Sequence, residues 1–297
     1  MRSPHTRAVL LALFVTFLWS TSWILIKTGL NDIPALTFAG LRYTLAWLVL
    51  LPIAARRGAL RELRTLSRGH WRGLIVLGLL VYALTQGTQF LALDRLPAIT
   101  LTLLLNFTSV LVALLGIVLL SERPTSGQWV GIAVYLTGVV VYFYPTMPSG
   151  ALIGLVFAGL CVLGNALGTI AGRSVNRPSD GGIALSPLAV TVASMGVGAP
   201  VMLVLGLLTQ SFPQITLQGV AIVLWLAVVN TALAFTLWNL TQRTLSAVES
   251  SVINNTMLIQ IAVLAWLFLG ETLDARAIIG LVLAGAGSLI VQLRRAA

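Results

Sequence analysis

Apolar stretches of about 20 residues alternate with short polar segments along almost the whole chain. A bilayer core of about 30 Å is crossed by about 20 helical residues, so each stretch can span a membrane. Runs such as 110–120 are continuously apolar and lack the alternation of membrane-barrel strands. The pattern predicts an all-α polytopic membrane protein with ten transmembrane helices. The predicted spans are 8–27, 34–54, 73–93, 97–120, 125–144, 150–172, 184–208, 216–239, 246–269 and 275–293.

The composition leads to the same class. Of the 297 residues, 58% are hydrophobic and only 9% are charged, and the mean hydropathy is +0.99. A soluble chain of this length needs more polar side chains to cover its surface, so a soluble fold is excluded. Cys161 is the only cysteine, and both histidines, His5 and His70, lie in polar flanks. We therefore expect no disulfide framework, no metal site and no cofactor.

The net charge of +10 gathers on one side of the predicted topology. With the N-terminus inside, fourteen arginines fall in cytoplasmic segments and two, Arg95 and Arg276, fall outside. Membrane proteins concentrate basic residues in their cytoplasmic loops, so both termini are predicted to be cytoplasmic in a bacterial inner membrane. The basic charge then indicates no nucleic-acid partner, although the six arginines within 56–72 also suit contact with anionic lipid head groups. The fourteen are Arg2, Arg7, Arg56, Arg57, Arg61, Arg64, Arg68, Arg72, Arg123, Arg173, Arg177, Arg243, Arg294 and Arg295.

An internal repeat becomes visible when the chain is slid by 149 residues. A gap-free match over two spans and their turn indicates duplication. Each half holds five spans, an odd number, so the second half enters the membrane inverted, as in many secondary transporters. We predict a first repeat at 1–147 and a second at 148–297. The matching residues are Ala98, Asn106, Ala113, Leu120, Glu122, Gly131 and Gly138, which fall on Ala247, Asn255, Ala262, Leu269, Glu271, Gly280 and Gly287.

Four segments resemble a known family. LLSERPTSGQWVGIAVYLTGVVV (119–141) and FLGETLDARAIIGLVLAGAGSLI (268–290) are similar to the two EamA-type repeats of the drug/metabolite transporter superfamily, as are FLWSTSWILIKTGL (17–30) and FAGLRYTLAW (38–47). Within it, the chain most resembles YddG-type amino-acid exporters. The resemblance implies a ten-helix exporter with two inverted repeats. One departure is that Thr108 and Met257 stand where EamA repeats often carry proline, so the resemblance does not imply how these helices bend.

Catalysis is not expected. No predicted span holds a histidine, and every carboxylate lies in a loop or within a turn of a span end. Arg42 is the one charge well inside a span, about 12 Å from the outer helix end. Two roles fit it, binding of a substrate carboxylate, or snorkelling and capping of carbonyls. Lys27, at the outer end of the first span, is expected only to snorkel.

Polar and aromatic residues inside the spans supply the other candidates. Tyr82, Gln86 and Gln89 share one helical face, and their equivalents after 149 residues are Thr231, Phe235 and Trp238. Each side chain either lines a substrate path or forms a static contact between helices. The same two roles fit Asn106, Asn254 and Asn255, while Trp19 and Trp23 suit a cavity wall or plain core packing. The candidate substrate-binding residues are Trp19, Ser22, Trp23, Arg42, Tyr82, Gln86, Asn106, Asn230, Trp238 and Asn255.

These observations favour an exporter of small metabolites that works by alternating access. Tryptophan, tyrosine and amide side chains with almost no carboxylate suit a zwitterion with an apolar side chain, hence amino acids, including aromatic ones. Because no carboxylate or histidine lies at mid-span, facilitated uniport is favoured over proton coupling. The alternatives are multidrug or organic-cation efflux and a scaffold without transport. The expected partners are the small-molecule substrate and membrane lipid, with no obligatory protein partner.

Overall fold

In the computed structural model the described residues are 4–120, 125–143, 151–176, 185–241, 244–245 and 247–293. Throughout these residues the secondary structure is helical and contains no strand, which confirms the all-α prediction. The first half contains α1 (Pro4–Gly29), α2 (Ala35–Arg56), α3 (Ala59–Arg64), α4 (Arg68–Gly78), the π-helix η1 (Leu79–Gln86), α5 (Gly87–Arg95), α6 (Ala98–Leu105), α7 (Phe107–Leu120) and α8 (Ser126–Phe143). The second half contains α9 (Leu152–Asn176), α10 (Pro187–Thr209), α11 (Leu217–Ala227), the π-helix η2 (Val228–Leu233), α12 (Ala234–Thr241), α13 (Ala247–Leu269) and α14 (Ala275–Leu293).

Most of these helices are long and apolar enough to cross a membrane. Nine such spans lie in the described residues, together with a shorter apolar segment, Ala98–Val112. Large apolar side chains such as Val140, Leu208 and Phe268 are exposed on the outside of the bundle. Lipid tails cover such side chains in a membrane, whereas a soluble protein does not leave so many in water. The chain is therefore a multi-pass membrane protein.

The predicted span at 97–120 differs from the prediction, because it is divided into α6 and α7 at Asn106. The Asn106 N–H is shared between the carbonyls of Leu103 and Thr102, at 3.2 and 3.3 Å. Its Nδ2 also donates to the Thr102 carbonyl at 2.8 Å. A side chain that bonds its own backbone competes with the regular helix ladder. The equivalent residue of the second half, Asn255, lies inside the unbroken α13.

The repeat is visible in the order of the helices. α4, η1, α6 and α8 begin at residues 68, 79, 98 and 126, and α11, η2, α13 and α14 begin 149 residues later, at 217, 228, 247 and 275. Both π-helices therefore occupy equivalent places in the two halves. The predicted boundary between 147 and 148, and Glu122, lie outside the described residues, so the division there stays a prediction.

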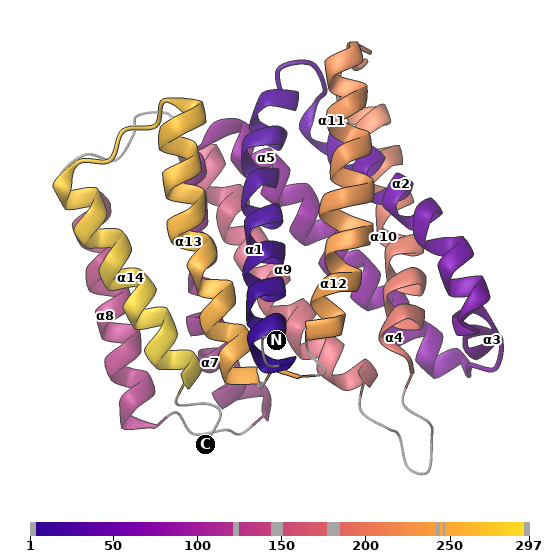
Figure 1. The fold of residues 1–297 in the computed structure, drawn as a ribbon, viewed down its shortest axis with the longest axis horizontal. Helices are drawn as coiled ribbons and strands as arrows, with labels where there is room; N and C mark the ends of the chain where they lie inside the picture. The colour runs from indigo at the N-terminus through magenta and orange to yellow at the C-terminus, as the bar shows by residue number, and fades with distance from the viewer. Residues whose placement is uncertain are drawn as a thin grey trace.

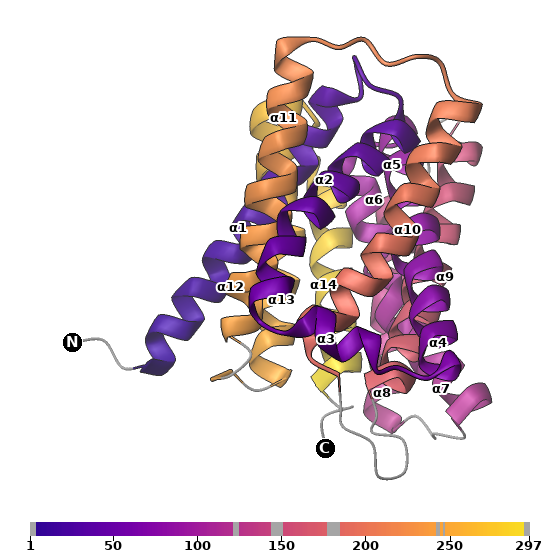
Figure 2. The same cartoon turned by 90° about the vertical axis from the view of Figure 1, so that its right-hand side faces the viewer.

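The two halves pack through pairs of equivalent helices. α8 lies along α14 and α2 lies along α10, as Figures 1 and 2 show. Residues 4 and 293, the first and last described, lie at one end of the bundle, which we call the terminal end (Figure 1). The connection between α1 and α2 lies at the opposite end, the far end.

Glycines bring α8 and α14 into backbone contact. A Cβ atom on Gly138 would lie 2.5 Å from the Ala284 nitrogen and 2.6 Å from the Gly280 carbonyl oxygen. A Cβ atom on Gly131 would lie 2.9 Å from the Gly287 oxygen. Small residues allow such close approach of membrane helices. Because Gly131 faces Gly287 and Gly138 faces Gly280, the two helices are antiparallel, and the 149-residue offset exchanges one pair for the other.

Candidate functional site

Both π-helices are stabilised by a threonine hydroxyl. Thr85 Oγ1 donates to the Leu80 carbonyl and Thr231 Oγ1 donates to the Leu226 carbonyl, each at 2.8 Å and each five residues back along the chain. A π-helix widens the helix and is uncommon, and it is frequently found at functional sites. The polar residues predicted inside the spans gather around these two segments.

Arg42 of α2 lies next to η2 and is buried, with 6% of its surface exposed. Its Nε donates to Thr231 Oγ1 at 3.2 Å, and its guanidinium carbon lies 5.0 Å from the centroid of the Tyr43 ring. Within the described part of the chain, no carboxylate lies within ion-pair distance of Arg42, and its two terminal amino groups have no hydrogen-bond partner. Arg42 is thus held in place by one nitrogen and offers the other two.

Tyr43 connects α2 to η1. Its hydroxyl donates to Gln86 Oε1 at 2.6 Å. Its ring meets the Tyr82 ring edge-on, with 5.6 Å between the centroids. Arg42 and Tyr43 are neighbours in sequence, so η1 and η2 both contact the same turn of α2. The structure brings Arg42, Tyr82 and Gln86 of the predicted set together.

Asn230 of η2 connects this group to α1. Its Nδ2 donates to Ser22 Oγ at 2.9 Å, to Thr21 Oγ1 at 3.2 Å and to the Leu18 carbonyl. In return, Trp19 Nε1 donates to the Asn230 carbonyl at 3.1 Å. Two successive η2 residues, 230 and 231, therefore contact α1 and α2. The contacts among Trp19, Ser22 and Asn230 were not evident from their spacing in the sequence.

An aromatic group continues from Trp19 toward the terminal end. The Trp19 ring centroid lies 5.1 Å from that of Trp238 and 5.4 Å from that of Phe235. Trp19 and Trp238 are only partly buried. The seam between α1 and α12 therefore carries aromatic surface next to the polar group, as a site for an amphipathic small molecule requires.

Three predicted residues lie elsewhere. Trp23 is buried in the main apolar core. Asn106 and Asn255 belong to a second polar group between α7, α13 and α14. In that group, Asn255 Nδ2 donates to Gln292 Oε1 at 3.1 Å, and Ser109 Oγ donates to the Asn106 carbonyl at 3.0 Å. Ser288 completes it, since its Oγ lies 3.0 Å from Ser109 Oγ and accepts from Gln292 Nε2 at 3.1 Å.

Comparison with known sequences gives the family. The sequence model of the EamA-like transporter family matches residues 6–144 and, a second time, residues 151–293. The chain belongs to the EamA-like transporter family. The double match agrees with the internal repeat seen in the helix order.

This EamA-like transporter has similar relatives in bacteria. A probable amino-acid metabolite efflux pump from Salmonella typhimurium (strain LT2) is 26% identical over 287 residues, which cover 93% of this chain and 92% of the relative. The uncharacterized transporter YoaV from Bacillus subtilis (strain 168) is 24% identical over 280 residues, 92% of both chains. Protein PecM from Dickeya dadantii (strain 3937) is 28% identical over 225 residues, 75% of this chain and 73% of its own.

One solved crystal structure has the same fold. It superposes with a TM-score of 0.67 over 97% of this chain and 98% of its own, at 18% sequence identity. Together, the relatives and the family show a transporter rather than an enzyme class. Among the residues described here, no group of three or more His, Cys, Asp or Glu side chains lies close enough to hold a metal ion.

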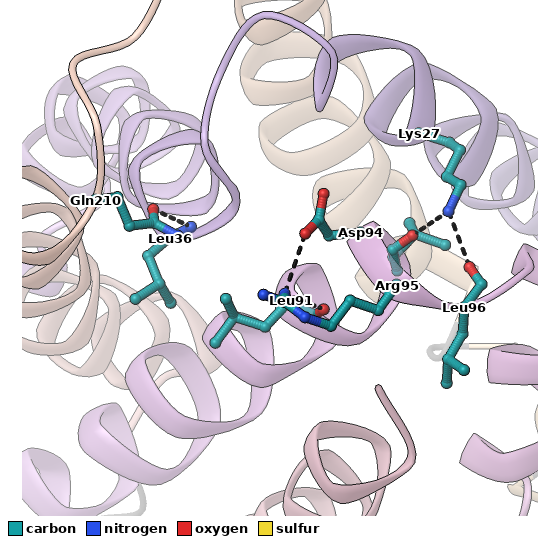
Figure 3. Close-up of polar contacts among 8 residues, drawn as sticks. Lys27, Leu36, Leu91, Asp94, Arg95, Leu96 and Gln210 are labelled. Atoms are coloured by element: carbon teal, nitrogen blue, oxygen red, sulfur yellow. Dashed lines mark hydrogen bonds and ion pairs between the residues drawn. The ribbon is translucent and has the colours of Figure 1, made fainter. Parts of the chain in front are cut away.

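Lys27 of this EamA-like transporter differs from the expectation that it only snorkels. Its Nζ donates to the Leu96 carbonyl at 2.9 Å and to the Leu93 carbonyl, so it caps the C-terminal end of α5 (Figure 3). The physical reason is that the last carbonyls of a helix lack partners in the helix and attract a cation. Lys27 therefore holds the turn between α5 and α6 at the far end.

Two further caps at the far end were missed in the sequence. Glu271, between α13 and α14, accepts from the N–H of Ala98 at 2.6 Å and from that of Ile99 at 3.0 Å, at the start of α6. Gln210, at the end of α10, caps α2 by accepting from the Leu36 N–H at 2.9 Å (Figure 3). Both join the second half to a helix start of the first half. The 149-residue match had marked Glu271 but not its partner.

Proposed function

We propose that this EamA-like transporter exports amino acids and related small zwitterions, including aromatic ones, across the bacterial cytoplasmic membrane. It works by alternating access between its two inverted repeats, with both termini in the cytoplasm. The family and the relative named a probable amino-acid metabolite efflux pump support export of this substrate class. The excess of arginine in the segments of the terminal end supports the orientation.

The observation that carries the proposal is the buried Arg42 without a carboxylate partner. A charge inside a membrane span is costly, and it is normally paired or used. Thr231 and the Tyr43 ring position the guanidinium but do not neutralise it. In the described residues no acidic side chain supplies the opposite charge. A substrate carboxylate supplies it in the bidentate geometry that guanidinium favours.

The same site disfavours organic cations. A cationic substrate needs a carboxylate or an aromatic cage, and a fixed guanidinium repels it. The rings of Trp19 and Trp238 offer apolar surface for a substrate side chain, while Gln86 offers amide hydrogen bonds for its head group. This division supports an amino acid rather than a simple organic anion.

The driving force in this proposal is the substrate gradient. A proton-coupled antiporter needs a titratable group that alternates access near mid-membrane. The described carboxylates and histidines flank the spans, and Arg42 does not release its proton in the physiological range. Transport therefore proceeds as facilitated uniport.

Flux through proteoliposomes tests the substrate class. Vesicles loaded with labelled phenylalanine, leucine or threonine are compared with vesicles loaded with a lipophilic cation. We expect saturable amino-acid efflux without an imposed pH gradient and no cation efflux. Saturable efflux of the cation but of none of the amino acids would overturn the proposal. Efflux that requires a pH gradient, with none down the substrate gradient, would overturn the uniport mechanism.

Variants of Arg42 test the site. Arg42→Gln removes a charged hydrogen-bonding partner, so the KM for every amino acid should rise by about 10- to 150-fold. Arg42→Lys keeps the charge but loses the planar fork, so it should lose less. Arg95→Gln is the matched control, since Arg95 is exposed at the far end and pairs with Asp94 at 3.0 Å. An unchanged KM in Arg42→Gln at normal membrane level would exclude Arg42 from the site.

A further inference from the structure

A cavity of about 260 Å³ opens at the terminal end, outside the site around Arg42. It lies between the first turns of α1 and the last turn of α12. Arg7, Ala8 and Leu11 line it from α1, and Leu240 and Thr244 line it from the opposite side. Because 7, 8 and 11 share one helical face, a stripe of α1 faces the end of α12 across an open space.

The cavity has an unpaired positive charge at its mouth. Arg7 is exposed, and within the described part of the chain it forms neither an ion pair nor a hydrogen bond. The nearest described carboxylate along this face, Glu249, is held by His5 Nε2 at 2.7 Å. The mouth therefore favours an anion and offers no acidic partner for a cationic group.

The walls of the cavity continue into surfaces that face lipid. On α1, Leu10, Phe14 and Phe17 are exposed at helical spacing beside the cavity stripe. On the other side, Leu240 lines the cavity and is itself 51% exposed. An occupant thus meets a cation at the membrane boundary and apolar side chains deeper in. Phospholipids have this division into a phosphate and acyl chains.

We propose that this cavity binds an anionic phospholipid of the inner leaflet. The phosphate lies at Arg7, near the Thr244 hydroxyl, and an acyl chain follows the seam between Leu11 and Leu240. The proposal rests on the orientation given above but not on the identity of the transported substrate. An anionic head group such as glycerol is favoured over ethanolamine, because a second cation at this mouth would be repelled by Arg7.

Lipid binding tests the proposal without a transport assay. The purified full-length protein is titrated with phosphatidylglycerol or phosphatidylcholine, and bound lipid is counted by native mass spectrometry. Arg7→Gln should lower phosphatidylglycerol affinity about fivefold, the effect of one basic residue near an anionic surface. Arg57→Gln removes an exposed arginine at the same end that does not line the cavity, and it should retain wild-type affinity.

Two further measurements exclude other readings. Thr244→Glu leaves Arg7 intact but places a negative charge at the mouth, so it should weaken phosphatidylglycerol binding as well. Inorganic phosphate at the same concentration should not raise the unfolding temperature of the wild type, whereas phosphatidylglycerol should. Equal phosphatidylglycerol affinity in wild type and Arg7→Gln would overturn the proposal, as would equal affinity for phosphatidylcholine. Stabilisation by inorganic phosphate that is lost in Arg7→Gln would show a site for soluble phosphate instead.

Discussion

Substitution of Gly138 by alanine should destabilise the contact between α8 and α14. The new Cβ atom would lie 2.5 Å from the Ala284 nitrogen, whereas ordinary contact begins near 3.4 Å, so the helices must separate by about 0.9 Å. The obstacle is backbone on a packed helix, which does not rotate away. Overpacking of this kind costs about 1–3 kcal/mol, and the better helix propensity of alanine returns at most about 1 kcal/mol.

Gly159 provides the matched control. It lies within α9, and nothing is within 4 Å of the position its Cβ atom would take. Gly159→Ala should therefore be neutral or up to about 1 kcal/mol stabilising. The assay is reversible unfolding of both purified variants in mixed micelles, with the free energy extrapolated to the native condition. Equal stability of Gly138→Ala and Gly159→Ala would refute the close backbone packing of α8 against α14.

Three other outcomes are expected. Glu271→Gln, which leaves one neutral oxygen for the two N–H groups at the start of α6, should lower the free energy of unfolding by about 1 kcal/mol, while the exposed Asp94→Asn should not; equal unfolding curves would contradict this cap. Trp238→Ala should weaken efflux of phenylalanine more than that of threonine, whereas Gln86→Leu should weaken both; equal losses in Trp238→Ala would show that its ring does not sense side-chain size. Cysteine labelling at residue 147 should occur only from outside the cell, and labelling from the cytoplasm would mean that the span count is wrong.

The membrane fold was predictable because hydropathy and helix length carry most of the information. Apolar runs of the right length gave the spans, and the 149-residue match gave the order of the helices in both halves. The break at Asn106 was not predictable, since Asn255 is the same residue type at the equivalent place and leaves α13 continuous. The difference comes from which local acceptor each side chain finds, Thr102 for Asn106 and Gln292 for Asn255.

The candidate site was predictable in residue type but not in arrangement. A charge, amides and rings inside spans are costly in lipid, so Arg42, Gln86 and Asn230 stood out in the sequence. Their partners Tyr43 and Thr231 did not, because a tyrosine or threonine in a span is common. The π-helices were invisible as well, since a shift in the backbone hydrogen-bond register leaves the hydropathy unchanged.

The glycine contact between α8 and α14 is self-complementary. The offset of 149 residues carries Gly131 to Gly280 and Gly138 to Gly287, so each helix presents to its partner the surface that the partner presents to it. A single five-helix unit would make the same contact with an inverted copy of itself, as an isologous dimer does. In such a dimer one glycine substitution would create two clashes. In the duplicated chain it creates one, so the fusion of the halves lets each glycine vary separately.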